Sequence, residues 1–184
     1  MSTTRATYGV DIGGVRRDLP LFEVAPGLRI AVLNILGDTE LVEAAAHALA
    51  GPLHERRPDV LVTAETKSIP LAHELSRELS LPYVVLRKLY RSYMGDAVEV
   101  ETNSITTGAT QKLYLDEKDR NAISGRRVAI VDDVISTGST LEGMRDAVRR
   151  ADGDIVAEAA VCTEGDPDAW PDVLALAHLP LFKD

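Results

Sequence analysis

Short apolar runs alternate along the chain with segments whose apolar residues recur at helical spacing. Leu71, Leu75 and Leu79, for example, are spaced by four and would form one apolar face of a helix. The apolar runs are too short for buried helices and end at polar or turn-forming residues, which is typical of buried strands. The predicted strands are 28–33, 60–64, 83–86, 111–115, 127–131, 155–162 and 173–177; the predicted helices run from Asp38 or Thr39 to about Ala50, and over 70–79 and 140–151.

Strands that alternate with helices and read as continuous apolar runs predict an α/β fold, with a mainly parallel, twisted sheet covered by helices on both faces. Residues 1–27, punctuated by glycine and proline, are predicted to be irregular. Gly51 and Pro52 predict the end of the first helix. The sequence has no repeat, low-complexity tract or linker that would divide it, so we expect one domain over 1–184. In parallel sheets the ligand site lies beyond the carboxyl ends of the strands.

Composition narrows the class of function. Twenty Lys and Arg against 29 Asp and Glu give a net charge of −9 at pH 7. This argues against a nucleic-acid partner, since that affinity depends on neutralising phosphates. Cys162 is the single cysteine, which excludes an intramolecular disulfide and a cysteine-based zinc cluster. With no apolar run long enough to cross a bilayer and no apolar signal core in the first residues, we expect a cytoplasmic protein without a membrane partner.

The most informative stretch is VAIVDDVISTGST, residues 128–140. A buried strand runs into Asp132 and Asp133, then into a loop of small hydroxyl residues around Gly138, then into a helix. Backbone N–H groups at a helix N-terminus bind phosphate, whereas carboxylates suit sugar hydroxyls or a bridging Mg²⁺. Together they indicate a binding site for a sugar phosphate. The alternative is that the acids simply cap the strand and the hydroxyl residues simply cap the helix. The chain contains neither a GxxxxGK[ST] loop nor a GxGxxG fingerprint.

This stretch resembles the signature of the type I phosphoribosyltransferases, whose two acids and Thr-Gly loop bind phosphoribosyl pyrophosphate (PRPP). The resemblance runs from about Gly13 to the C-terminus and looks closest to the adenine phosphoribosyltransferases. GGVRRDLPLF (13–22) is similar to the hood segment that covers the base, and 60–88 resembles the pyrophosphate loop with the strand after it. The resemblance implies a purine phosphoribosyltransferase of purine salvage, with Mg²⁺ as cofactor, PRPP and a purine base as partners, and a homodimer.

The resemblance also assigns roles to single residues. Asp132 and Asp133 would bind the ribose hydroxyls and reach, through water, a Mg²⁺ ion held mainly by PRPP. The remaining PRPP contacts would be the phosphate loop Ser136, Thr137, Gly138, Ser139 and Thr140, the pyrophosphate loop Glu65, Thr66, Lys67 and Ser68, and Arg91.

Three cations, Lys67, Arg87 and Lys88, are the expected catalytic groups at the leaving pyrophosphate. Lys67 stands where close members carry Arg, which keeps the charge but loses the bidentate fork. Solvated charges after a strand are the alternative for Arg87 and Lys88. Arg17 and Asp18 in the hood are the expected base contacts, although a flexible tail would look similar.

Residues 89–110 lie where the family keeps its mobile catalytic loop, which would close over the reaction and exclude water. The alternation of valine and glutamate over 98–101 would also fit an ordinary β-hairpin, so both interpretations stay open. Adenine enzymes carry a glutamate in this loop, whereas the nearest alignment puts Thr106 or Thr107 there.

Other departures bear on the base. Hypoxanthine-guanine enzymes carry an aspartate where this chain has Ser136. Residues 104–115 look somewhat like the xanthine branch and its purine-repressor relatives, which read a 6-oxo group with a lysine after the last core strand, but 163–166 contain no lysine. We therefore expect a purine, with adenine ahead of a 6-oxopurine such as xanthine, hypoxanthine or guanine. A PRPP-binding regulatory paralogue without catalysis is the alternative of a different class.

Overall fold

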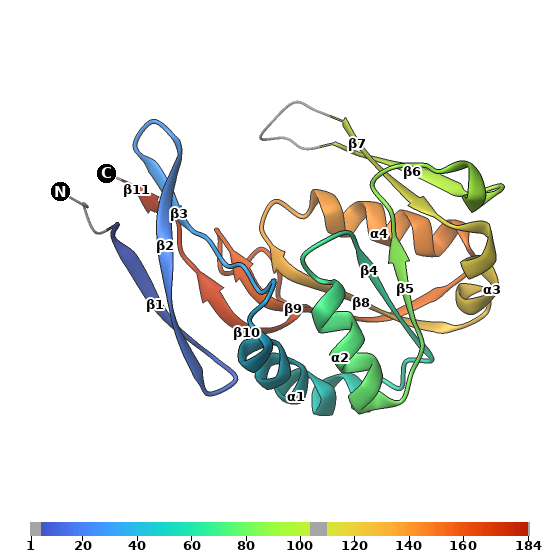
Figure 1. The fold of residues 1–184 in the computed structure, drawn as a ribbon, viewed down its shortest axis with the longest axis horizontal. Coiled ribbons are helices and arrows are strands. Elements are labelled where there is room, and N and C mark those ends of the chain that lie inside the picture. The colour runs from blue at the N-terminus through green and yellow to red at the C-terminus, as the bar shows by residue number, and fades with distance from the viewer. Residues whose placement is uncertain (1–4, 104–109, 184) are drawn as a thin grey trace.

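The computed structural model describes residues 5–103 and 110–183 (Figure 1). At its centre lies a five-stranded sheet in the order β10-β9-β8-β4-β5, in which all neighbouring strands are parallel. Its strands are β4 (Val60–Ala64), β5 (Tyr83–Leu86), β8 (Arg127–Ile135), β9 (Asp154–Glu164) and β10 (Leu174–Leu179). The predicted α/β fold with a mainly parallel sheet is thereby confirmed.

Helices cover both faces of this sheet, as predicted. α1 (Thr39–Glu55) and α2 (Ile69–Leu79) share a buried core with Ala129 and Val131 of β8. Val128 and Ile130, which alternate with them, face the opposite core, formed with α3 (Arg120–Ile123) and α4 (Ser139–Arg150). A strand buried on both sides must be apolar at every position, which is why β8 reads as a continuous apolar run. Among the described helices, none has the length and apolar character needed to span a bilayer.

A second, antiparallel sheet forms the hood beside the main body (Figure 1). It has the order β1-β2-β3-β11, with β1 (Thr7–Ile12), β2 (Val15–Ala25), β3 (Leu28–Ala31) and β11 (Phe182–Lys183). The prediction that 1–27 are irregular is therefore wrong for 7–25. Gly13 and Gly14, at φ +60° and +86°, make the tight turn between β1 and β2. The predicted strand 28–33 ends at Ala31 and belongs to the hood.

The prediction that Gly51 and Pro52 end the first helix is also wrong. α1 continues through both residues to Glu55. Pro52 removes one backbone hydrogen bond, at a cost of about 3 kcal/mol for an interior proline. Leu53, the next residue, is completely buried, and burying a leucine stabilises by about 1.5–3 kcal/mol. The burial of Leu53 thus offsets most of the free energy that Pro52 costs the helix.

Residues 89–115 include a short helical turn, η1 (Ser92–Met94), and an antiparallel pair of strands, β6 (Val98–Asn103) and β7 (Thr110–Leu115). Val100, Leu113 and Leu115 are buried in the core beside α4. The hairpin interpretation thus accounts for the described strands. Residues 104–109 lie outside the described part of the chain, and catalytic loop motion over 89–110 stays a prediction.

Candidate functional site

A cavity of about 580 Å³ opens at the carboxyl edge of the main sheet, where the parallel-strand rule predicts a site. The residues after β4 and β5 and the C-terminal ends of β8 and β9 contribute polar side chains, and the end of β3 with the residues after it contributes an apolar wall. The lining residues are 30–33, Leu36, 65–68, Lys88, Asp132, Asp133, Val134, Thr140 and Glu164.

The acid pair lies near the end of β8, inside the strand and not after it as the predicted boundary of 127–131 implied. Asp132 is only 7% exposed, and its Oδ1 accepts hydrogen bonds from the Ser68 hydroxyl and from the Asp133 backbone N–H, both at 2.9 Å. Burial, together with the neighbouring Asp133 charge, raises the pKa of Asp132 to about 7. Asp132 is therefore costly to ionise, and the two carboxylates together suit hydroxyl donors or a cation.

The loop after β4 carries Lys67 into the cavity, where Lys88 also lies at the end of β5. Glu65 ties the two strand ends together: its carboxylate pairs with the Arg87 guanidinium and accepts a 2.9 Å hydrogen bond from the Lys88 backbone N–H. The Glu65 charge raises the pKa of Arg87. Of the three predicted catalytic cations, Lys67 and Lys88 line the cavity, whereas Arg87 is held in the ion pair behind it. The predicted PRPP contact Arg91 lies beyond the lining as well.

The predicted phosphate loop surrounds a smaller hollow of about 50 Å³ at the N-terminus of α4. All five predicted residues line it, and Thr140 lines the larger cavity too. Gly138 has φ +79°, and a Cβ there would come within 2.2 Å of Trp170 Cη2. The Trp170 indole N–H also donates to the Ser136 carbonyl at 3.2 Å. Trp170 thus covers the back of the loop and fixes its shape, a contact between distant segments that the sequence did not predict.

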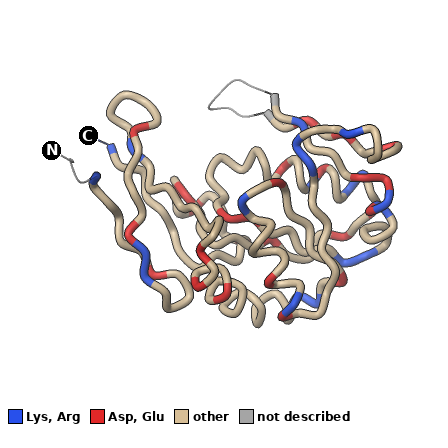
Figure 2. Tube along the Cα trace, viewed as in Figure 1, with Lys and Arg blue, Asp and Glu red and all other residues tan. Residues whose placement is uncertain are grey.

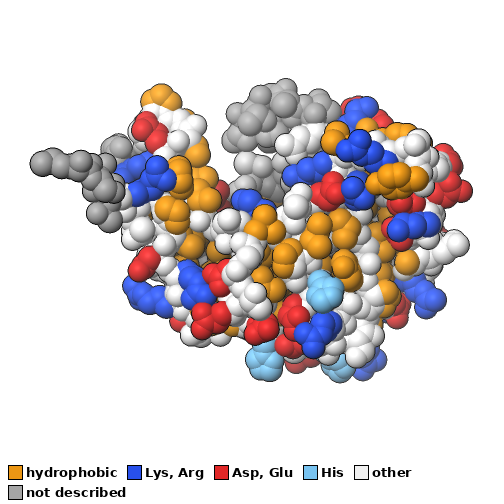
Figure 3. All heavy atoms as spheres, viewed as in Figure 1, with side chains coloured by type: hydrophobic (Ala, Val, Ile, Leu, Met, Phe, Trp, Pro, Cys, Tyr) orange, Lys and Arg blue, Asp and Glu red, His pale blue; other side chains and the backbone are white. Residues whose placement is uncertain are grey.

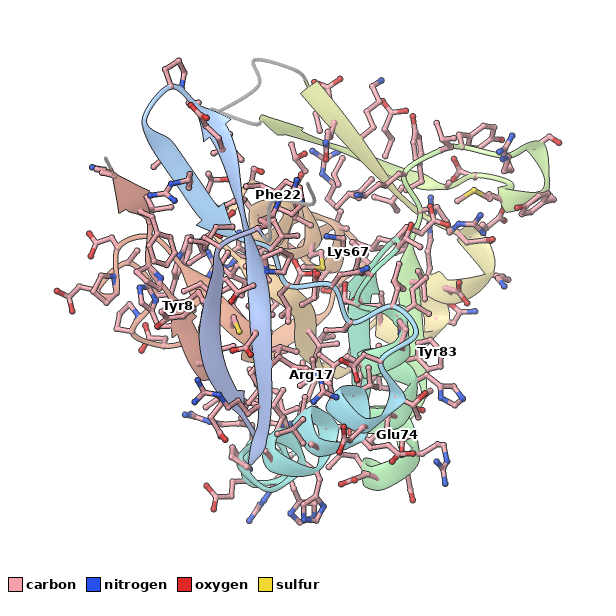
Figure 4. All side chains as sticks on the ribbon, turned by 60° about the vertical axis from the view of Figure 1, so that its left-hand side comes forward. Tyr8, Arg17, Phe22, Lys67, Glu74 and Tyr83 are labelled. Atoms are coloured by element: carbon pink, nitrogen blue, oxygen red, sulfur yellow. The ribbon has the colours of Figure 1, made fainter. Side chains whose placement is uncertain are left out.

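The predicted base contacts are not brought to the cavity. Arg17 makes a bidentate pair with Asp38, at 2.7 and 2.8 Å, and a further 2.8 Å contact with Glu40 at the start of α1. The hydrogen bonds from Arg17 hold the pKa of Asp38 below its ordinary value. Figure 4 shows Arg17 beside α1 and apart from Lys67, which faces the space between hood and main sheet. Asp18 is exposed on β2 next to Arg17.

Sequence reasoning missed the apolar wall of this cavity, which is formed by residues 30–33 and Leu36. Leu36, which is 44% exposed, extends this wall toward the mouth of the cavity. On the face drawn in Figure 3, hydrophobic side chains gather in the middle of the molecule between the hood and the β6–β7 hairpin. Acidic and basic positions are interspersed along the trace (Figure 2), so an anionic ligand depends on local groups and not on the field of the whole protein.

A helix N-terminus and carboxylates at the same edge of an α/β sheet form the kind of site that suits a phosphorylated sugar. A family model described as a phosphoribosyl transferase domain matches residues 33–175, and the chain belongs to this family. The resemblance to type I phosphoribosyltransferases is thereby confirmed.

Relatives with different names match the chain. It is 30% identical over 142 residues to the purine biosynthesis transcriptional activator PurR of Lactococcus lactis, covering 77% of this chain and 51% of that protein. It is 40% identical over 108 residues to a hypoxanthine/guanine phosphoribosyltransferase of Methanococcus voltae, covering 59% of this chain and 54% of that protein. The chain thus spans about half the length of these curated relatives.

Solved adenine phosphoribosyltransferases share the fold. The enzyme of Thermoanaerobacter pseudethanolicus has a TM-score of 0.66 at 19% identity, covering 94% of this chain and 95% of that one. The enzyme of Rhodothermus marinus has a TM-score of 0.64 at 24% identity, covering 94% of each chain. At such identities the likeness shows the fold alone.

Proposed function

We propose that this protein transfers the phosphoribosyl group of PRPP to a purine base, giving a nucleoside monophosphate and pyrophosphate. The observation that carries the proposal is the order of groups along the sheet edge. The Lys67 and Lys88 side chains follow β4 and β5, the acid pair lies near the end of β8, and the predicted phosphate loop follows that strand. This sequence of cation, carboxylate and phosphate sites matches the pyrophosphate, ribose hydroxyls and 5′-phosphate of PRPP.

The proposed chemistry is a substitution at C1 of the ribose. The bond from C1 to the pyrophosphate oxygen breaks, a bond from C1 to a ring nitrogen of the base forms, and the base loses its N–H proton. Lys67 and Lys88 stabilise the negative charge that develops on the leaving pyrophosphate. Asp132 and Asp133 accept hydrogen bonds from the ribose hydroxyls and so orient C1. Loop closure over 89–110 would exclude water from the oxocarbenium-like state.

The residues present fit a Mg²⁺ ion carried by the substrate. Among the described residues, no group of three or more His, Cys, Asp or Glu side chains is arranged to hold a metal. Asp132 and Asp133 nevertheless offer the oxygen ligands that Mg²⁺ prefers, in the same cavity as the cations. PRPP would supply most of the ligands, and the ion would supply charge neutralisation at the leaving group. A homodimer and a cytoplasmic location complete the proposal.

The direct test incubates the protein with PRPP, Mg²⁺ and adenine, hypoxanthine, guanine or xanthine in parallel, and separates the products by chromatography. We expect a nucleoside monophosphate, with adenine as the first candidate acceptor. Asp168→Asn, at an exposed site away from the cavity, serves as the matched control for Asp133→Asn. Absence of product with every base would contradict the proposal.

A PRPP-binding regulator is the second candidate, because relatives named as purine biosynthesis regulators match three quarters of this chain. The same cavity would then bind PRPP as a signal. Calorimetry with PRPP and Mg²⁺ separates the two functions. Binding without turnover for any base would favour the regulator, whereas turnover would exclude a purely regulatory role.

A further inference from the structure

Glu164, the last residue of β9, is a carboxylate that the chemistry proposed above leaves unused. It is half-buried and lines the main cavity together with the apolar wall of 30–33 and Leu36. No hydrogen bond or ion pair joins its side chain to any other described residue. Burial raises the pKa of Glu164, and no other described residue compensates its charge. A half-buried carboxylate without a hydrogen-bond partner is a strong acceptor for N–H donors.

The order of the sheet places Glu164 opposite the cations. β9 and β4 flank β8 on its two sides, so the acid pair of β8 lies between Glu164 and the loop that carries Lys67. With strands about 4.8 Å apart, the ends of β9 and β4 are separated by roughly 10 Å. If the proposed substitution at C1 is correct, the attacking base must approach from the side opposite the leaving pyrophosphate. The base would then lie at the β9 end, between the apolar wall and Glu164.

We propose that Glu164 reads the edge of the base and selects a purine that carries an exocyclic amino group. A carboxylate oxygen accepts a hydrogen bond from such an amino group, as in adenine or guanine. When the carboxylate oxygen faces a carbonyl oxygen of the base, both atoms carry lone pairs and neither carries a proton, which is unfavourable in a half-buried site. The apolar wall holds the ring faces and contributes no preference between amino and oxo groups. This inference rests on the proposed function and names its specificity-determining residue.

The test measures binding of AMP, GMP and IMP by calorimetry, because IMP lacks an exocyclic amino group. For the wild-type protein we expect AMP or GMP to bind more tightly than IMP by on the order of 10- to 100-fold, the range for a hydrogen bond to a charged group. Glu164→Gln should reduce this ratio to about threefold or less, since an amide can donate to a carbonyl as well as accept. Glu43→Gln makes the same change on an exposed face of α1 and should leave the ratio unaltered.

Glu164→Lys is a second, independent test, in which we expect the preference between nucleotides to be reversed. Its ammonium group donates only, so the preference should shift toward IMP. An unchanged ratio in both variants, or wild-type binding of IMP as tight as that of AMP and GMP, would overturn the role of Glu164. Failure of the wild-type protein to bind any nucleotide, with no product from any base, would overturn the proposed function and this inference with it. Circular dichroism and urea unfolding confirm that each variant is folded.

Discussion

The buried carboxylate of Asp132 should make the ligand-free protein less stable as the pH rises. Its Oδ1 accepts two hydrogen bonds, from Ser68 and from the Asp133 backbone, yet burial and the Asp133 charge still raise the pKa of Asp132 from 3.8 to about 7. In the unfolded chain the group ionises near its ordinary pKa. Between these two values the folded state binds more protons than the unfolded state, so the free energy of unfolding falls as pH increases.

Asp132→Asn tests this directly, because the amide keeps an oxygen that accepts from Ser68 and Asp133 but carries no charge. With the pKa at 3.8 unfolded and about 7 folded, the linkage relation gives a loss on the order of 3 kcal/mol between pH 4.5 and pH 8. The variant should escape this loss. Asp132→Asn should therefore raise the free energy of unfolding, relative to the wild type, more at pH 8 than at pH 4.5. The same substitution should weaken PRPP binding.

The assay is urea unfolding at both pH values for the wild-type protein, Asp132→Asn and the exposed control Asp168→Asn. The quantity of interest is the change in unfolding free energy from pH 4.5 to pH 8, compared between proteins, since this cancels effects common to all. We expect the control to follow the wild type. Parallel pH dependence in the wild type and Asp132→Asn would refute the reasoning, since Asp132 would then ionise without penalty.

Three further predictions test the site by substitution. Asp133→Asn should lower kcat/KM for PRPP by more than about 100-fold. Cys162→Ala, at a buried position outside the cavity lining, should alter kcat/KM by less than about threefold. Equal turnover in both variants would contradict the assignment of Asp133 to the site. Lys67→Met should lower kcat/KM for PRPP by about 10- to 100-fold, and Lys67→Arg should recover part of this loss. If Lys67→Met had the steady-state kinetics of the wild type, Lys67 would have no role in the reaction. Gly138→Ala should abolish PRPP binding in calorimetry, because the new Cβ would lie 2.2 Å from Trp170 on a backbone with φ +79°. Wild-type affinity for PRPP in this variant would disprove the tight fit of the loop against Trp170.

Much of the main sheet, and of the candidate site at its carboxyl edge, followed from the sequence. Residues 128–140 combine a continuous apolar run, two acids and a glycine-containing hydroxyl loop, and each part has a local physical cause. The predicted helix 140–151 differs by a residue at each end from α4. Local signals misled where a long-range contact outweighed them, as at Pro52, where the burial of Leu53 keeps the helix intact.

By itself, then, the sequence determined most strands and helices of the main sheet, the acid pair and the hydroxyl loop after it, because periodicity and turn chemistry act within a dozen residues. Only the tertiary structure decided that Arg17 pairs with Asp38, that Arg87 is held by Glu65, and that Glu164 lies across the acid pair from Lys67. These pairings depend on the order of strands in the sheet and on the docking of the hood. No single segment encodes that order, because it is set by how all the apolar faces are buried together.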